Sequence, residues 1–375
     1  MTQATLAGLA GVSQSYISQV ESGIKGVERR STLVSLAAAL QVSVVDLLGQ
    51  PGDPTDPLKA GAAAAVPAIR VVLIEIDEGE RRPPARGPEE MAAAAEQVRA
   101  LRARSEYAPM AGLLPGLLPD AAAYGRLTLA EVGHAASECL SSLGYRDMAM
   151  LAARVAVNAA QEAENPAWIG STRFVYTLSL PIEAAPTTSR VADKALNALQ
   201  DKASDTDVRQ MLGQLHLSAS LVCAVDRRPD DAAAHLAEAH REAATLGDPD
   251  DGIGFNVLAF GPTNLGLWRM AVETELGEYG RVIELARRIE PRRLKVANRH
   301  QSYWLHLGRA LAHSGKTDRE ALVAFMNAER AAPVPFGLNP MARDTVVSMV
   351  HRARRRSVSD DLRMLARRLG VEVAA

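Results

Sequence analysis

The feature that most restricts the fold is a pattern of small and apolar residues between Gln3 and Ser22. Ala7 is small enough to let two helices touch, and Gly11 can adopt the positive φ that ends a first helix. Ser13 is well suited to cap a second helix through its hydroxyl. Four further positions supply a miniature apolar core: Leu6, Val12, Ile17 and Val20. The spacing predicts two short helices joined by a tight turn.

This arrangement is a helix-turn-helix, in which the second helix can enter a DNA major groove. Gln14, Ser15, Ser18 and Gln19 then point outward, with Tyr16 at the edge of the helix. Amides and hydroxyls of this kind can read base edges, and Gln pairs naturally with adenine. The alternative is a pair of amphipathic helices in an ordinary bundle, where small-residue turns also occur.

Residues 2–48 resemble the XRE family, which has the Cro/C1-type, lambda-repressor-like fold. The matching positions are Thr2-Gln3, Leu6-Ala7, Ala10-Gly11-Val12-Ser13, Ile17-Ser18, Glu21-Ser22-Gly23, Thr32-Leu33 and Leu36-Ala37-Ala38-Ala39-Leu40. By this resemblance a fifth helix covers Val42 to Leu48.

The resemblance also implies roles for individual residues. Gln3 would touch a phosphate and support the recognition helix, whose Gln14, Ser15, Ser18 and Gln19 would face bases. Lys25, Arg29 and Arg30 would hold the DNA backbone, unless they simply line a solvated loop. Phosphate contacts of this kind set the register of a protein on DNA. Glu21 is expected to be a fold residue, because phosphates repel a carboxylate.

In one respect the chain departs from the family, which places an arginine-rich helix before the Thr-Gln. Here the chain starts at Met1, so either its start lies too far downstream or the domain is truncated. Without that helix, part of the apolar surface should lose its cover: Leu6, Leu9, Leu36 and Leu40. Residues 1–50 also carry equal numbers of acidic and basic side chains. Because DNA affinity comes largely from phosphate neutralisation, this segment alone should bind weakly.

The whole chain of 375 residues is long enough for two or three domains. A net charge of -2 gives no general attraction to nucleic acid or anionic membranes, so a DNA contact must be local. Cys139 and Cys223 lie in helical patterns and are expected to be buried, reduced thiols. With no signal peptide or membrane-spanning stretch evident, we expect a cytoplasmic, nucleoid-associated protein with no membrane partner.

A Pro-, Gly- and Ala-rich linker is expected over residues 49–88. Prolines argue against a continuous helix from Gly49 to Val66. Within the rest of this segment, Ile69, Val72, Leu73 and Ile76 have helical spacing, which favours a short helix over residues 67–76.

From Glu89 to the end, helical periodicity predominates and strands are not evident. The clearest repeat contains Trp304, Leu307-Gly308 and Leu311, followed by Gly315, Ala321, Phe325, Ala328 and Pro333, and it resembles a tetratricopeptide repeat. Second helices of successive pairs should begin near Arg146, Thr187, Asp230, Tyr279, Thr317 and Ser359. Their spacing of roughly forty residues exceeds the usual period of about 34. We therefore predict an all-α fold with a tetratricopeptide-like solenoid over residues 89–375. An irregular helical bundle is the alternative.

A solenoid of this kind has a concave groove lined by first helices. Candidate ligand residues in it are Asn264, Arg269, Ser302, Arg309 and His313. No spacing of His, Cys or acidic residues predicts a metal site, and no motif predicts a cofactor or an enzymatic nucleophile.

Together these features favour a bacterial transcriptional regulator with an XRE-type domain at residues 1–48, a linker and a repeat domain. The repeat domain would sense a peptide, a small molecule or a protein partner, or would dimerise. Because one recognition helix contacts few base pairs, binding of double-stranded DNA as a homodimer is implied. The competing hypothesis is an interaction scaffold with a vestigial N-terminus that does not bind DNA.

Overall fold

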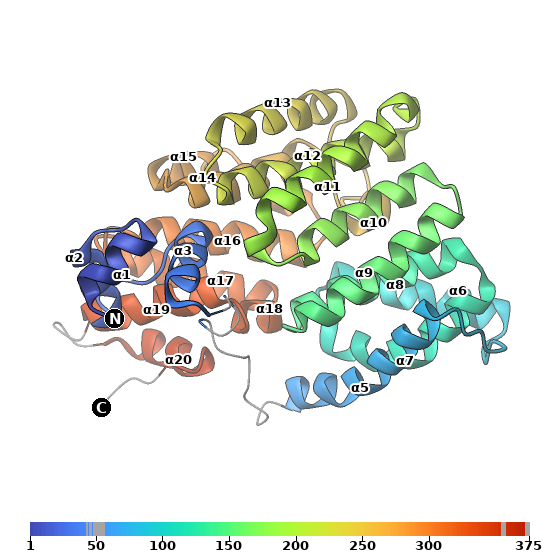
Figure 1. Cartoon of the computed structure of the whole chain (residues 1–375), viewed down its shortest axis with the longest axis horizontal. Coiled ribbons are helices and arrows are strands. Elements are labelled where there is room, and N and C mark those ends of the chain that lie inside the picture. The colour runs from blue at the N-terminus through green and yellow to red at the C-terminus, as the bar shows by residue number, and fades with distance from the viewer. Residues whose placement is uncertain (43, 45–46, 48–56, 354–357, 372–375) are drawn as a thin grey trace.

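The computed structural model describes residues 1–42, 44, 47, 57–353 and 358–371. All regular elements in these ranges are helices, which confirms the all-α class. The first three form an N-terminal unit: α1 (Gln3–Ala10), α2 (Gln14–Glu21) and α3 (Arg30–Leu40). The remaining helices form a large curved array (Figure 1). Most of the helix expected over Val42–Leu48 and the first part of the expected linker fall outside the described residues.

The turn between α1 and α2 has the geometry that its sequence predicts. Gly11 ends α1 with φ 67°, in the left-handed region that glycine tolerates best. The hydroxyl of Ser13 accepts a hydrogen bond of 3.1 Å from the amide of Tyr16, so Ser13 caps α2. Ala7 and Ile17 are buried between the helices. The expected miniature core is therefore present.

The segment after residue 56 differs from the expected linker. A single helix, α5 (Pro57–Asp77), replaces the short helix of residues 67–76 and continues through Pro67. A proline inside a helix costs about 3 kcal/mol. Burial of Val66, Ile69 and Leu73 against the array offsets this cost, because fully burying each such side chain contributes about 1.5–3 kcal/mol. Local propensity is thus overridden by packing.

Helix α5 packs on α7 and α9 at one end of the array. The two helices that follow it are α6 (Pro88–Ala103) and α7 (Tyr107–Tyr124). The residues between α5 and α6 are exposed except Arg86, whose guanidinium donates to Asp120 over 2.6 Å. Only part of the expected linker is therefore a connection between helices.

Pairs of antiparallel helices build the rest of the array. The first helices are α8 (Arg126–Ser142), α10 (Pro166–Ser179), α12 (Thr206–Val225), α14 (Pro262–Leu276), α16 (Ala297–Ala312) and α19 (Pro340–Ala353). The second helices are α9 (Arg146–Glu162), α11 (Ala185–Leu199), α13 (Pro229–Leu246), α15 (Tyr279–Ala286), α17 (Asp318–Ala331) and α20 (Asp360–Arg368). Each first helix also packs on the next first helix, as in a solenoid. The second helices begin within two residues of their predicted starts.

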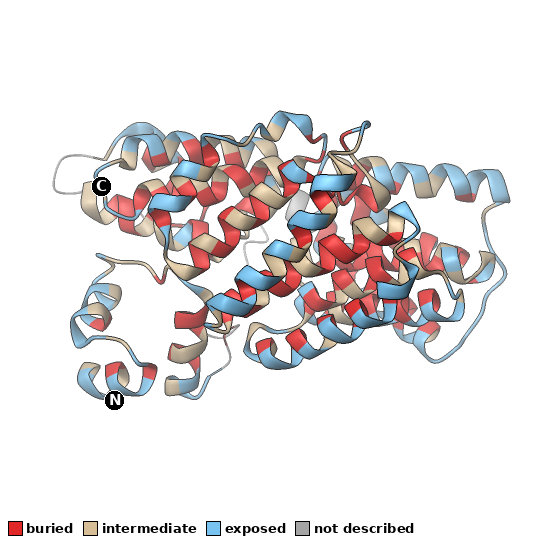
Figure 2. Cartoon of the chain, turned by 90° about the horizontal axis from the view of Figure 1, so that it is seen from above, coloured by how far each residue is buried: buried red, intermediate tan, exposed pale blue. Residues whose placement is uncertain are grey.

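Short elements complete the described chain: η1 (Ile182–Ala184), η2 (Gln200–Lys202), η3 (Phe255–Val257), η4 (Pro291–Arg293) and α18 (Pro333–Gly337). The first helices carry much of the buried surface, which Figure 2 shows as red bands through the array. Cys139 and Cys223 are both buried and unpaired, as expected. None of the described helices is long and apolar enough to cross a membrane.

Gly308, the small residue of the clearest repeat, lies where two helices approach closely. A methyl group added at Gly308 of α16 would lie 2.9 Å from the ring of Phe325 on α17. Phe325 is fully buried at this contact. The Leu307-Gly308 pair therefore forms a notch that receives the aromatic side chain of the second helix.

Candidate nucleic-acid interface and its contact with the helical array

Helix α2 presents an uncovered polar face. Gln14, Ser15, Ser18 and Gln19 are exposed, as is the capping residue Ser13. The amide of Gln19 donates to the hydroxyl of Ser15 over 3.5 Å, along the same face. The residues predicted to read bases thus share one accessible surface, and the array does not cover it.

Two interactions stabilise α2 on the side away from this exposed face. The amide of Gln3 donates to the carboxylate of Glu21 over 2.6 Å, which ties α1 to the end of α2. Tyr16 is half-buried, and the ammonium of Lys25 lies 5.4 Å from its ring centroid. Burial, with the nearby Glu28 carboxylate, raises the pKa of Tyr16 to about 12, so its phenol stays neutral. Gln3 and Glu21 thus support the helix, and the predicted phosphate contact of Gln3 remains a prediction.

The apolar face expected to lack cover does so in part. Leu9 is 62% exposed and Leu40 is 37% exposed. Leu36 is 5% exposed, because it belongs to the core that α1 and α3 share. Leu6 is partly buried against the same core. The expectation is therefore confirmed for Leu9 and Leu40, holds in part for Leu6 and is wrong for Leu36.

The sequence model of one protein family, described as a helix-turn-helix domain, matches residues 1–48. No curated protein shows significant similarity to the chain. The family match covers the segment whose turn, cap and buried core have just been described. In the described part of this segment, α1, the turn at Gly11 and α2 form a helix-turn-helix, and this part is called the helix-turn-helix domain below. The repeats of the array, by contrast, remain tetratricopeptide-like by resemblance.

The helix-turn-helix domain is docked on the array through the loop before α3. The two carboxylate oxygens of Glu28 each lie 3.1 Å from Nδ1 of His313, the residue that follows α16. The phenol of Tyr279 donates to Glu28 over 3.3 Å, and its ring stacks on His313 with centroids 4.1 Å apart. Arg309 donates to the backbone oxygen of Glu28. One loop residue is therefore held by three side chains of the array.

A buried carboxylate makes the second docking contact. Glu275 near the end of α14 is 2% exposed. It accepts from the backbone amide of Arg30 over 2.9 Å, and the Arg30 guanidinium lies 3.5 Å away. Arg309, also buried, approaches the same carboxylate at 3.9 Å. A carboxylate this deeply buried needs such cations, because isolated buried charge is costly.

The docking contacts follow one edge of the array, where the turns within successive helix pairs lie side by side (Figure 1). Glu183, between α10 and α11, accepts from the amide of Val44 over 3.0 Å. Arg227, between α12 and α13, donates to Ser35 over 3.2 Å. Met341 of α19 inserts into the apolar core of the domain. Together with the contacts of α14–α15 and α16–α17, five helix pairs of the array therefore contribute to the docking surface.

All three predicted backbone-binding cations lie at the junction with the array. Arg30 is paired with Glu275, and Lys25 lines a pocket between the domain and the array. Arg29 is exposed at the N-terminus of α3, and its guanidinium lies beside Gly277 at the end of α14. Nothing in the structure tests whether these side chains hold DNA, so their phosphate contacts remain predictions.

The five groove candidates do not form one ligand site. Arg309 and His313 contact the helix-turn-helix domain, and Asn264 is fully buried, donating to Gln214 and to the backbone oxygen of Leu258 over 3.1 Å each. The other two are partly exposed away from these contacts: Arg269 lies 3.6 Å from Glu273, and Ser302 is half-buried. Four of the five lie on first helices and His313 directly follows one, but the helical period carries no information about what covers each helix.

Part of the surface expected to be a groove is filled by the segment between α13 and α14. Phe255 packs edge-on against Trp168 of α10, with ring centroids 5.4 Å apart. Asn256 donates to Ser171 over 2.7 Å and accepts from Arg102 of α6 over 2.7 Å. Asn256 has φ 45°, a costly conformation that these buried hydrogen bonds maintain. The chain itself therefore occupies this face.

The key docking residues Glu28, Glu275 and Tyr279 were absent from the sequence-based candidates. Their partners lie 245 to 285 positions away, so no local spacing signals the contact. Within the described residues, no three metal-binding side chains cluster as a metal site would require.

Proposed function

We propose that this protein is a sequence-specific DNA-binding transcriptional regulator whose helical array controls the helix-turn-helix domain. The observation that carries the proposal is the exposed polar face of α2, on a domain whose family match is to helix-turn-helix proteins. Base contacts in this motif come mainly from the N-terminal residues of the second helix. In this chain those are Gln14 and Ser15, which lie clear of the docking contacts.

Control by the array is supported by the residues that docking uses. Arg30 and Lys25 are proposed phosphate contacts, and both lie at the junction with the array. Each phosphate neutralised contributes to affinity through counterion release. A docked domain therefore offers fewer cations to DNA than a released one, which allows the array to tune affinity.

We further propose that the regulator acts as a homodimer in the cytoplasm, because a single recognition helix reads too few base pairs for useful specificity. Light scattering coupled to size exclusion should report twice the chain mass, alone or with DNA. A single chain per DNA site would refute the dimer while leaving DNA binding in place.

The test of DNA binding begins with selection of sites from a random duplex library by the full-length chain. Fluorescence anisotropy on the selected site then measures affinity against salt. Gln14→Ala should weaken specific binding by about 5- to 150-fold, equivalent to the loss of about 1–3 kcal/mol for a bidentate base contact. Gln97→Ala, an exposed glutamine on α6, is the matched control and should have no effect.

Arg30→Ala should reduce the slope of log affinity against log salt by about 1. Failure to select any site, with a folded protein, would refute the regulator and favour an interaction scaffold whose N-terminal domain no longer binds DNA.

A further inference from the structure

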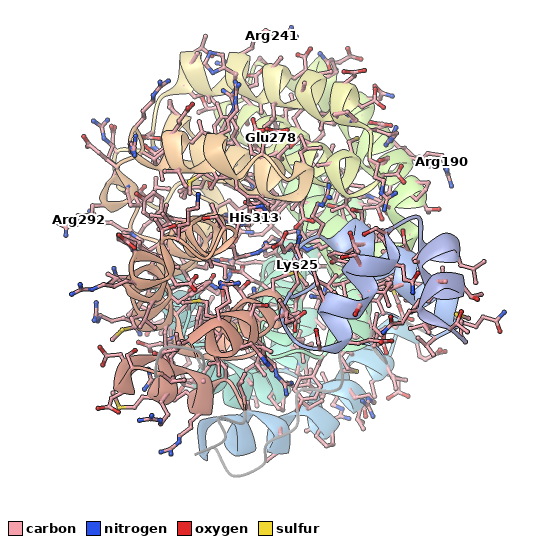
Figure 3. All side chains as sticks on the ribbon, turned by 90° about the vertical axis from the view of Figure 1, so that its left-hand side faces the viewer. Lys25, Arg190, Arg241, Glu278, Arg292 and His313 are labelled. Atoms are coloured by element: carbon pink, nitrogen blue, oxygen red, sulfur yellow. The ribbon has the colours of Figure 1, made fainter. Side chains whose placement is uncertain are left out.

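A pocket of about 210 Å³ lies where the helix-turn-helix domain meets the array. One wall comes from the end of α2 and the following loop, including Gln19 and Lys25. The opposite wall comes from α15, α16 and α19, including His313, Asp344 and Arg352. Figure 3 shows Lys25 and His313 facing this junction from the two sides. Any molecule bound in the pocket would touch both parts of the protein.

Most charged groups in these walls already have partners. Glu28 accepts from His313 and Tyr279, and the guanidinium of Arg352 forms bonds of 2.7 and 2.9 Å to Asp318. Arg309 donates to the Glu28 backbone. These groups shape the pocket and leave little net charge to attract a ligand.

Two charged groups remain without a partner among the described residues. The ammonium of Lys25 forms no ion pair or hydrogen bond, and neither does the carboxylate of Asp344. Burial raises the pKa of Asp344 to about 6, and the nearby charges of Arg343 and Arg309 offset this shift only in part. The cation of Lys25 and the carboxyl group of Asp344 therefore lie on opposite walls of one small pocket.

We propose that the pocket binds a small zwitterion, such as a free α-amino acid, with its carboxylate on Lys25 and its ammonium on Asp344. Its volume is below the roughly 300–1,000 Å³ of sites for drug-sized ligands, so the ligand is of amino-acid size. The hydroxyls of Thr345 and Ser348 donate to backbone oxygens of α19, which leaves their lone pairs as acceptors for further ligand protons.

This inference rests on the proposed function for its consequence. A ligand that bridges Lys25 and Asp344 fastens the domain to the array and withdraws Lys25 from phosphate. By linkage, the ligand must then weaken DNA binding, and DNA must weaken ligand binding by the same factor.

The test uses isothermal titration calorimetry on the full-length chain, with each proteinogenic L-amino acid as a probe and with acetate and ethylamine as half-ligands. We expect at least one amino acid to bind with a dissociation constant below about 1 mM, and neither half-ligand to match it. Lys25→Met and Asp344→Asn should each weaken binding by about 10-fold or more, in line with the loss of a charged partner.

Two matched controls carry the same chemical changes at exposed sites outside the pocket. Lys316→Met and Asp360→Asn should leave binding unchanged. The proposal is overturned if no amino acid binds, if acetate or ethylamine binds as tightly, or if the pocket variants bind as the wild type does. Pocket variants that bind as the wild type does would place the ligand elsewhere. Acetate or ethylamine binding as tightly as an amino acid would indicate a simple ion site.

DNA binding without added amino acid is measured separately on the same preparations. Amino-acid binding that depends on Lys25 and Asp344, in a chain that selects no DNA site, would refute the regulator and retain the pocket. Selective DNA binding without any amino-acid binding would refute the amino-acid pocket and retain the regulator.

Discussion

The buried carboxylate of Glu275 provides the sharpest test of docking. Glu275→Gln keeps the shape of the side chain and an acceptor for the Arg30 amide, but it removes the charge that faces two guanidinium groups. Breaking a buried ion pair typically costs about 3–5 kcal/mol. Because the Arg30 side chain is 33% exposed, water relieves part of this cost, and we expect about 2–4 kcal/mol.

Native-state hydrogen exchange can measure this change at the contact itself. The Arg30 amide donates to Glu275 in the docked state, so its exchange reports release of the domain. A loss of about 2–4 kcal/mol corresponds to exchange faster by about 30- to 800-fold, at 1.4 kcal/mol per factor of ten. Amides within α8, which packs on α6, α7, α9 and α10, should change little.

Glu273→Gln is the matched control for this experiment. It lies on the same helix two residues earlier and pairs with Arg269 and Arg281 of the array at 3.6 and 3.4 Å. It should leave exchange at Arg30 unchanged. Equal exchange at Arg30 in wild type and Glu275→Gln would mean that the ion pair contributes nothing to docking, and the reasoning would fail.

Three further outcomes follow from particular contacts. Asp344→Asn should stabilise the fold above pH 6, by at most about 3 kcal/mol, and this gain should vanish near pH 4. Because the pKa of Asp344 is raised in the folded protein, the wild type loses stability as pH rises from about 4 to 6. A difference in melting temperature between variant and wild type that does not change with pH would contradict this expectation. Gly213→Ala places a methyl group 1.9 Å from the Phe260 ring and should cost about 1–3 kcal/mol in urea unfolding, whereas Gly112→Ala, with open space around it, should stabilise by about 0.5–1 kcal/mol; equal effects would refute the packing argument. Ser13→Ala removes the cap of α2 and should cost about 1 kcal/mol, visible as faster amide exchange at the start of α2 and absent if the cap is unimportant.

The parts of the fold that local chemistry controls could be predicted from the sequence. Gly11 and Ser13 specify a turn and a cap that need no distant partner. The second helix α9 begins at Arg146 as expected, because Gly144-Tyr145 leaves room only for a tight turn between two helices. Gly308 likewise signals the notch for Phe325, since the repeat places both at fixed spacing.

The parts that depend on long-range packing could not be predicted in this way. The expected short helix begins at Pro67, yet α5 continues through this proline, and Ile69 and Leu73 are buried against the array. Asn264 has the periodicity of an exposed first-helix residue, but the segment before α14 covers it through Leu258. Polar residues at such positions carry the same signal in the sequence whether they face solvent, a ligand or another part of the chain.

The docking site shows why residues that bind a ligand are hard to distinguish, from sequence alone, from residues that contact another part of the chain. Arg309 and His313 were expected to meet a ligand, and in the structure they meet Glu28 of the chain's own domain. A surface that holds Glu28 is chemically suited to acidic groups, so the helix-turn-helix loop occupies it as a ligand would. Release of the domain would leave Arg309 without the Glu28 oxygen and Glu275 without Arg30, and only the contact of 3.9 Å between Arg309 and Glu275 would remain.

The free energy needed to open the contacts between the domain and the array limits how strongly the array can control DNA binding. If docking is incompatible with the Arg30 phosphate contact, DNA must first open the Arg30–Glu275 pair. With about 2–4 kcal/mol for the pair, docking can weaken DNA binding by no more than about 30- to 800-fold through this contact alone. Glu275→Gln should then tighten binding to a selected site by up to the same factor as it accelerates exchange at the Arg30 amide. Equality of these two factors is the signature of one shared equilibrium, and faster exchange without tighter DNA binding would show that the docked domain already binds DNA fully.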